Sequence, residues 1–179
     1  MLKLKEYTLA EISYLHGSLS NIDNEALIKL CLESKERWSD DPTNTKFEDL
    51  KLPINKELNN VVDSIMSQYL DTYQIRLNLE AIWAQVHHKY ESTNIHNHAT
   101  QDCLTSGPDI SGVYYIQIPK DAGKLVFVYN TNQYQTRRTW IHPIVGDFYM
   151  FPASLNHFVT KNLSEDLRIA VSFNFSYEK

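Results

Sequence analysis

The feature that most limits the possible folds of this chain is a change of periodicity near residue 75. Beyond it, apolar and polar residues alternate in short segments at 75–86, 111–118, 124–129, 139–142, 147–151, 157–160 and 167–177. Alternation with period 2 is typical of β-strands. Turn-forming residues separate the segments at 119–123, 130–132, 143–146 and 162–166. Seven or eight strands without intervening helices predict an antiparallel sandwich or jelly roll.

Before residue 75, apolar residues recur at helical spacing in two segments. Residues 23–38 predict a helix with Asn21 or Ser20 as its N-cap, ended by the polar residues 39–44 around Pro42. Residues from about 53 to 73 predict a second helix with Pro53 near its first turn and one wide apolar stripe. Residues 2–15 predict only a short strand or an irregular arm. We expect one domain over 1–179, in which 1–75 form an arm and helical support and 76–179 form the β core.

Composition argues against some classes of function and favours one cellular compartment. The chain has 179 residues and a formal net charge of −5, which argues against broad nucleic-acid binding through phosphate contacts. No apolar run is long enough to span a membrane. Two distant cysteines, Cys31 and Cys103, and no apolar N-terminal signal segment predict a reducing cytoplasm, that of the host cell if a phage encodes the chain. The oligomeric state cannot be inferred from these features.

Three histidines in the β region have the spacing of metal ligands. His96 and His98 stand two positions apart, so their imidazoles point the same way on an extended backbone. His157 follows a proline turn at the start of a later strand and offers a third nitrogen. Iron, zinc, copper and nickel accept imidazole, and three protein ligands leave coordination positions open. Together the three side chains predict a catalytic metal site.

The last strand divides its residues between two faces. One face carries Arg168, Ala170, Ser172 and Asn174, and the other is apolar from Ile169 onward. Arginine stays charged when partly desolvated and pairs with carboxylates through two hydrogen bonds. This strand therefore predicts a cavity that receives a carboxylate, the alternative being a surface strand with an ordinary arginine.

A first predicted strand also presents several polar and aromatic side chains on one face. Trp83, Gln85 and His87 share that face. Trp83 or His87 could line a substrate groove, and the alternative for each is packing in the core or on the surface.

The pieces occur in a distinctive order: His96-x-His98, Ser-Gly-Val-Tyr-Tyr, Gly-Lys-Leu-Val-Phe, Gly-Asp-Phe-Tyr-Met-Phe-Pro, Asn-His157, and Arg168-Ile-Ala-Val-Ser-Phe-Asn. In this order the chain resembles the 2-oxoglutarate- and Fe(II)-dependent oxygenases, over about residues 76–177. The likeness is to a bacterial and phage group and, more loosely, to the prolyl hydroxylases. It implies a mainly β fold, a cupin-like double-stranded β-helix or jelly roll, packed against about two N-terminal helices.

The resemblance also implies cofactors and residue roles. Fe(II) is held by a His-x-Asp/Glu pair and a distal histidine, 2-oxoglutarate chelates the iron, O2 is the oxidant, and ascorbate is a stimulant. By position, His96 is the first ligand, His157 the distal ligand and Arg168 the anchor of the far carboxylate. Tyr115 is similar in position to a tyrosine that hydrogen-bonds that carboxylate in prolyl hydroxylases, or it is a core residue. The expected cosubstrate-binding residues are Arg168, Tyr115, Ser172 and Asn174.

Position 98 departs from the family pattern, because a histidine replaces the usual carboxylate. His98 can ligate in a three-histidine site, which is the outcome we favour on spacing. Alternatively Asp102 or Asp109 supplies an acidic ligand, or the position is vacant or taken by water. With His98 bound, the iron lacks one negative charge relative to the family pattern.

The implied activity is a dioxygenase that hydroxylates a C–H bond and decarboxylates 2-oxoglutarate to succinate. A peptidyl residue, with proline first, is the favoured substrate, and a nucleobase or a small metabolite is the alternative. Two other functions remain open: a three-histidine iron dioxygenase that does not use 2-oxoglutarate, and a non-catalytic, cupin-like metal-binding module.

Overall fold

The computed structural model describes residues 12–34, 48–99, 107–132 and 134–178, which form two helices and ten strands. The helices are α1 (Asn24–Glu33) and α2 (Lys56–Tyr73). The strands are β1 (Leu15–Ser18), β2 (Glu48–Lys51), β3 (Leu77–His87), β4 (Thr93–His96), β5 (Ile110–Gln117), β6 (Leu125–Asn132), β7 (Gln135–Ile141), β8 (Asp147–Pro152), β9 (Asn156–Val159) and β10 (Arg168–Tyr177). Neither helix in this part of the chain combines the length and the apolar character needed to cross a membrane.

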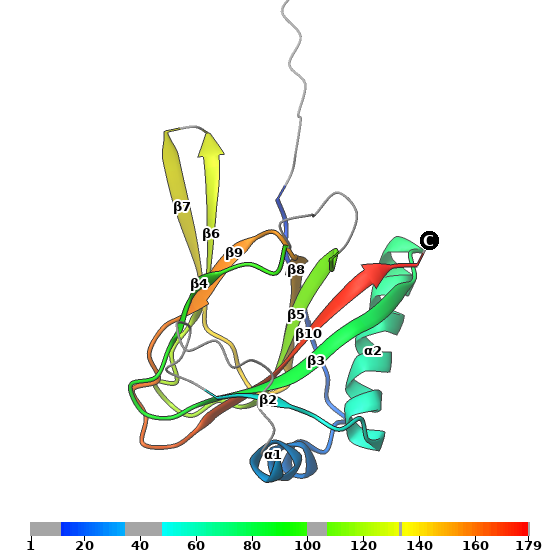
Figure 1. The fold of residues 1–179 in the computed structure, drawn as a ribbon, viewed down its shortest axis with the longest axis vertical. Helices are drawn as coiled ribbons and strands as arrows, with labels where there is room; N and C mark the ends of the chain where they lie inside the picture. Colours follow the sequence, from blue (N-terminus) through cyan, green and yellow to red (C-terminus); the bar gives the residue numbers. More distant parts are fainter. Residues whose placement is uncertain (1–11, 35–47, 100–106, 133, 179) are drawn as a thin grey trace, which may run out of the picture.

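The strands form two sheets that face each other (Figure 1). The larger sheet has the order β1-β8-β5-β10-β3-β2, and the smaller has the order β4-β9-β6-β7. Neighbouring strands are antiparallel in both sheets. The chain passes back and forth between the two sheets, which is the arrangement of a jelly roll or double-stranded β-helix. The expected fold class is therefore observed.

Both helices begin at a residue whose side chain accepts a backbone N–H. Asp23 accepts one at 3.0 Å at the start of α1, and Asn55 accepts one at 2.8 Å at the start of α2. Such caps satisfy donors that have no partner inside the helix. Asn21 and Ser20 were the wrong expectation for the first cap, because Asp23 lies directly before the first helical turn.

The helix ends also differ from expectation. α1 ends at Glu33, because Ser34 has an extended backbone with ψ of 129°. The expected ending at 39–44 lies outside the described residues. α2 begins at Lys56, so Pro53 precedes the helix. α2 ends where Gln74 adopts the left-handed conformation, with φ of 58°.

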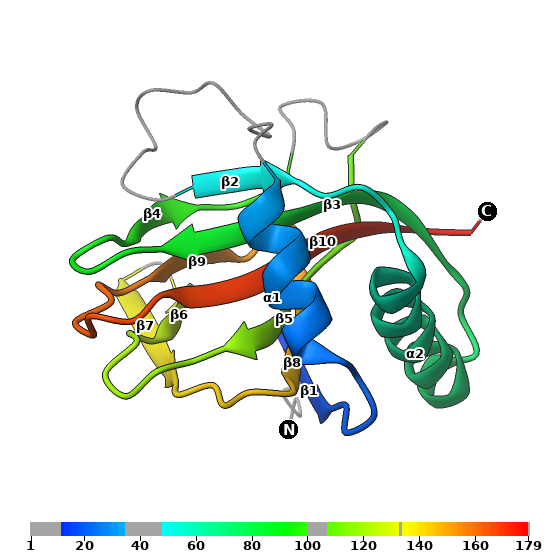
Figure 2. The ribbon, with the colours of Figure 1, turned by 90° about the horizontal axis from the view of Figure 1, so that it is seen from below.

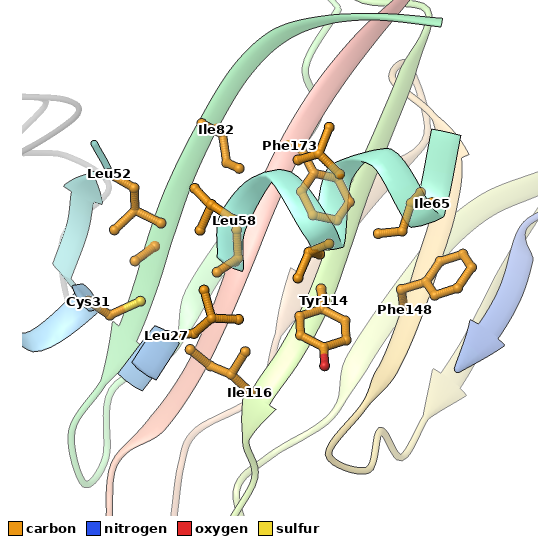
Figure 3. Close-up of a cluster of buried hydrophobic side chains, with 14 of the residues drawn as sticks. Leu27, Cys31, Leu52, Leu58, Ile65, Ile82, Tyr114, Ile116, Phe148 and Phe173 are labelled. Atoms are coloured by element: carbon orange, nitrogen blue, oxygen red, sulfur yellow. The ribbon is translucent and has the colours of Figure 1, made fainter. Parts of the chain in front are cut away.

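The two helices cover one face of the larger sheet (Figure 2). Leu27 and Cys31 of α1 and Leu58 and Ile65 of α2 are buried there, in one cluster with Phe173 of β10 (Figure 3). Complete burial of an aliphatic or aromatic side chain of this size contributes about 1.5–3 kcal/mol. This outer core makes the larger sheet a rigid wall for whatever lies on its other face.

A second, inner core lies between the two sheets. Tyr115 and Phe151 of the larger sheet pack there with Leu125 and Phe127 of the smaller one. β10 contributes to both cores, since Ile169, Val171, Phe173 and Phe175 belong to the outer cluster and Ala170 to the inner one. The predicted division of the last strand between a packing face and an inner face is therefore observed.

Some strands differ from the sequence-based expectation. β1 pairs with β8 and β2 pairs with β3, so the N-terminal region adds two edge strands to the larger sheet. Residues 1–11 of the expected arm lie outside the described part. Residues 130–132, expected to form a turn, continue β6 and pair with β7. Edge and hairpin residues take their strand conformation from a partner, which a local pattern does not reveal.

Candidate active site

Three histidines meet where β4 ends and β9 begins. His96 and His157 are opposite each other in the β4–β9 pair, and their ring centroids are 4.3 Å apart. His98 follows β4, and its backbone N–H donates to the Ala153 carbonyl at 2.8 Å. One potential ligand atom from each of the three histidines lies within 4.8 Å of the other two. The structure therefore brings together the three residues that the sequence predicted as metal ligands.

The backbone determines which ring nitrogen is free in two of these histidines. His96 Nδ1 lies 2.8 Å from the Asn94 carbonyl oxygen, and His157 Nδ1 lies 2.9 Å from the Leu155 carbonyl oxygen. A carbonyl oxygen only accepts, so each Nδ1 carries the proton and each Nε2 keeps its lone pair. Metal-binding histidines are oriented by such hydrogen bonds from their second nitrogen.

Burial keeps the three rings neutral. It lowers the pKa of His157 well below its usual value and also lowers the pKa of His96. Burial, with a smaller effect of the His96 ring, lowers the pKa of His98 to about 4. Metals bind the neutral imidazole, so these rings are ready to coordinate at neutral pH. The donor set fits Fe(II) and other borderline metals, with one negative charge fewer than two histidines and a carboxylate.

Arg168, at the start of β10, is a cation with an exposed fraction of 0%. Its Nη1 donates to His87 Nδ1 at 3.2 Å. Its Nε and Nη2 have no hydrogen-bond partner among the described residues. Burial lowers the pKa of the guanidinium, yet arginine remains protonated in proteins. A buried cation with unused donors is costly unless an anion pairs with it.

Tyr115 of β5 lies beside this cation. Its ring centroid is 5.2 Å from Arg168 Cζ, and its hydroxyl also lacks a hydrogen-bond partner in the part of the chain that the structure describes. Burial raises the pKa of Tyr115 to about 12, so the hydroxyl is a neutral donor at physiological pH. Tyr115 and Arg168 therefore lie side by side, each with a donor that has no partner among the described residues.

A narrow cavity between the sheets connects the histidines with the arginine. The polar residues that line it are Gln85, His96, His98, Tyr115, His157, Arg168 and Ser172. Apolar side chains, among them Val113, Leu125 and Phe151, form the rest of its wall. A cavity with metal ligands at one place and a buried cation at another suits a ligand with two separated anionic groups.

The other predicted site residues are placed differently. Ser172 lines the cavity, but Asn174 does not, and the Asn174 Oδ1 accepts a hydrogen bond from Ser111 Oγ at 2.7 Å. Asp109 is not part of the histidine group, and its Oδ2 accepts the Tyr177 backbone N–H at 2.8 Å. Asp102, like Cys103, lies outside the described residues.

Three contacts near the site were not predicted. The Asn97 side chain, between two of the histidines, donates to Asn156 Oδ1 at 2.8 Å and ties the His-x-His segment to β9. His87 does not line the cavity, and its Nδ1 instead contacts Nη1 of Arg168. The Trp83 ring lies 5.6 Å from the His98 ring, centroid to centroid. Alternation placed Trp83 and His87 on one face of the strand, but it does not reveal which side chains they touch.

Solved structures of low sequence identity share this fold. SnoK, a non-heme alpha ketoglutarate dependent carbocyclase from nogalamycin biosynthesis, aligns with a TM-score of 0.70 and 17% identity over 92% of this chain and 79% of SnoK. The viral collagen prolyl hydroxylase of Paramecium Bursaria Chlorella virus-1, solved with 2-oxoglutarate, gives 0.65 and 14% over 90% and 94%. HygX from Streptomyces hygroscopicus, solved with nickel, 2-oxoglutarate and hygromycin B, gives 0.64 and 13% over 92% and 83%. The fold is that of the double-stranded β-helix oxygenases.

The sequence itself identifies the family. A family model described as "Putative 2OG-Fe(II) oxygenase" matches residues 81–174, which is more than half of the chain. The chain therefore belongs to the 2-oxoglutarate- and Fe(II)-dependent oxygenase family. No curated protein matches the sequence.

Proposed function

We propose that this protein is a 2-oxoglutarate- and Fe(II)-dependent dioxygenase that hydroxylates a C–H bond of a peptidyl residue, with proline as the first candidate. The observation that carries the proposal is one cavity lined by both a cluster of three neutral imidazoles and a buried arginine. A 2-oxo dicarboxylate has the matching pair of ends, because its oxo-acid group can chelate a metal while its second carboxylate pairs with a guanidinium.

Each residue has a defined part in this proposal. His96, His98 and His157 would hold the iron, and Arg168 with Tyr115 would bind the far carboxylate. Bound iron and 2-oxoglutarate supply the oxidising chemistry: O2 and 2-oxoglutarate are consumed, and succinate, CO2 and the hydroxylated substrate are formed. The apolar cavity wall excludes water, which strengthens the Arg168–carboxylate interaction and limits side reactions. O2 as oxidant and stimulation by ascorbate belong to the same proposal.

A peptide substrate is supported by fold neighbours and by the position of the metal site. One structural neighbour is a collagen prolyl hydroxylase, and another is a prolyl hydroxylase solved with a peptide of hypoxia inducible factor. Beside the site, an open groove is lined by Ile12, Tyr129, Thr136, Ser154 and Asn156, none of them charged. An uncharged groove that includes Asn156, the residue before the candidate ligand His157, suits a neutral chain segment. Small molecules are the competing class of substrate, since HygX was solved with hygromycin B bound.

The first experiment is an anaerobic titration of metal-free protein with Fe(II) and 2-oxoglutarate. We expect the weak visible charge-transfer band of an iron–2-oxoglutarate chelate, its loss in His157→Ala, and weaker 2-oxoglutarate binding in Arg168→Ala. Absence of the band despite iron binding would contradict the cosubstrate assignment. Incubation with proline-containing peptides, O2 and ascorbate, followed by mass spectrometry, would then test the peptide class through the gain of one oxygen atom.

One observation favours a second candidate. A donor set of three imidazoles without a carboxylate is also the ligand set of iron dioxygenases that do not use 2-oxoglutarate. In such an enzyme Arg168 has no cosubstrate to bind, so Arg168→Ala would leave the cosubstrate requirement unchanged. A protein that binds zinc and shows no turnover of 2-oxoglutarate would instead be a cupin-like binding module.

A further inference from the structure

The buried arginine is held by a histidine rather than by a carboxylate. His87 lies directly opposite Arg168 in the β3–β10 pair, and both side chains have exposed fractions of 0%. Arg168 Nη1 and His87 Nδ1 are 3.2 Å apart, and His87 Nε2 is 2.9 Å from Thr93 Oγ1. The histidine therefore lies between the guanidinium and a buried hydroxyl.

The donor rules of these groups determine the tautomer of His87. A guanidinium has five N–H donors and no acceptor, so His87 Nδ1 accepts the hydrogen bond from Arg168. The ring proton is then on Nε2, which donates to the Thr93 hydroxyl oxygen. Burial, with the nearby positive charge of Arg168, lowers the pKa of His87 well below its usual value, which agrees with a neutral ring.

Because His87 bonds Nη1 of Arg168, a specific pair of donors on the guanidinium has no partner among the described residues. Nε and Nη2, which have no partner among the described residues, are the two nitrogens whose N–H bonds run parallel along one side of a guanidinium. This side-on pair is one that a carboxylate can take with two hydrogen bonds. His87 occupies Nη1 and so holds the planar group in one orientation, in which no described residue takes the side-on pair.

We propose that His87 is a positioning residue for the cosubstrate: by accepting from Arg168 Nη1 as a neutral ring, it presents the Nε/Nη2 pair to the far carboxylate without neutralising the charge. This inference rests on the proposed function. A carboxylate in the place of His87 would cancel the charge that the cosubstrate needs, whereas a neutral acceptor leaves it intact.

The surrounding contacts keep His87 in place. Asn162, with an exposed fraction of 0%, donates through Nδ2 to the His87 backbone carbonyl at 3.1 Å. Thr93 begins β4, the strand that ends at His96, so the hydroxyl that receives the ring proton belongs to the same strand as a candidate metal ligand. Such supporting hydrogen bonds orient the groups that contact a ligand.

The test compares two ligands that differ only in the far carboxylate. Mn(II)-loaded protein is titrated calorimetrically with 2-oxoglutarate and with 2-oxopentanoate, in which a methyl group replaces that carboxylate. We expect His87→Leu to raise the dissociation constant of 2-oxoglutarate about tenfold or more, and that of 2-oxopentanoate by less than about twofold. His87→Asn, which keeps an acceptor near the Nδ1 position, should restore 2-oxoglutarate affinity to within about threefold of wild type. His88→Ala, at the exposed neighbouring position, is the matched control.

Different results separate failure of this inference from failure of the proposed function. If the wild-type protein does not prefer 2-oxoglutarate to 2-oxopentanoate, the cosubstrate assignment itself fails. If it does, and Arg168→Met removes the preference while His87→Leu keeps it, only the role of His87 is overturned. Equal weakening of both ligands in His87→Leu would reduce His87 to a structural support.

A measurement on the wild-type protein keeps the inference testable if His87→Leu does not fold. Nitrogen-15 NMR of the histidine side chains distinguishes the two neutral tautomers and the imidazolium. We expect His87 to be protonated on Nε2 alone, with and without 2-oxoglutarate. Protonation on Nδ1, or on both nitrogens at neutral pH, would contradict acceptance from Arg168.

Discussion

His96 and His157 are register partners across β4 and β9, and each ring is oriented by a hydrogen bond from its own Nδ1 to a backbone carbonyl. The strand pairing therefore sets the distance between the two rings, and a carbonyl two residues earlier in each segment sets the nitrogen that each ring presents. A site held by the backbone in this way is organised before any metal binds, which keeps the cost of metal binding low.

Removal of a candidate ligand should abolish tight metal binding. We expect His96→Ala and His157→Ala to weaken Fe(II) or Mn(II) binding by about a hundredfold or more, since loss even of a residue that only supports a ligand costs about 10–100-fold. Calorimetric titration of metal-free protein measures this change. His142→Ala, at an exposed position, should leave the affinity unchanged; retained binding in His157→Ala would place the metal elsewhere.

The role of His98 can be tested by restoring a carboxylate. His98→Asp adds a negative charge and a hard oxygen donor to a site of neutral imidazoles. We expect its affinity for Mn(II) relative to Zn(II) to rise by about tenfold or more, because the added charge lies close to the dication. Competition titration with the two metals gives the ratio, and an unchanged ratio would mean that position 98 lies outside the coordination sphere.

Replacement of Arg168 should lower the affinity for 2-oxoglutarate without lowering the stability of the fold. Arg168→Met exchanges a buried cation, two of whose donors have no partner among the described residues, for an apolar side chain, which removes the cost of burying an unpaired charge. We expect the free energy of unfolding without cosubstrate to equal or exceed that of the wild type, while 2-oxoglutarate affinity falls about a hundredfold. Urea unfolding and calorimetry measure the two quantities. A loss of stability above about 2 kcal/mol would show that the guanidinium is better paired than its contacts indicate.

The neutral state of His87 predicts a pH dependence of stability. Because the folded pKa of His87 is lowered well below 6.5, the unfolded chain takes up a proton as pH falls through about 6.5 and the folded protein does not. The contribution of His87 to the free energy of unfolding is therefore complete above pH 6.5 and is lost as pH falls. Between pH 6.5 and 5, the free energy of unfolding should fall more steeply in the wild type than in His87→Asn, by up to about 1.4 kcal/mol per pH unit. The free energy of unfolding is measured by urea unfolding at each pH. The same pH dependence in both proteins would exclude this linkage.

The outer core should determine stability independently of the site. Ile65 of α2 has an exposed fraction of 0% in the layer between the helices and the larger sheet. We expect Ile65→Ala to lower the free energy of unfolding by about 2–5 kcal/mol through lost burial and a residual cavity. Metal affinity at temperatures where the variant is folded should not change. Ile54→Ala, at an exposed position, is the control, and a comparable loss of stability there would contradict this assignment.

Much of the fold could be predicted because burial on one face imposes a local pattern. The alternation from Ile169 to Phe175 identified both faces of β10, and the stripe on α2 identified its buried side. The edge strands β1 and β2 escaped prediction, since their conformation depends on pairing with β8 and β3. The predicted end of the first helix was also wrong, because the backbone becomes extended at Ser34 before the apolar spacing stops.

In the site, sequence patterns identified the candidates whose relation is local or repeats with period 2. His96 and His98 are close in sequence, and Arg168 lies on the inner face of its strand. The tertiary structure was needed to show that His157 faces His96, and that His87 accepts from Arg168 while the side-on donors have no partner among the described residues. The physical reason is strand register: contacts between distant strands are set by inter-strand hydrogen bonds and packing over the whole sheet, and these leave no local spacing in the sequence.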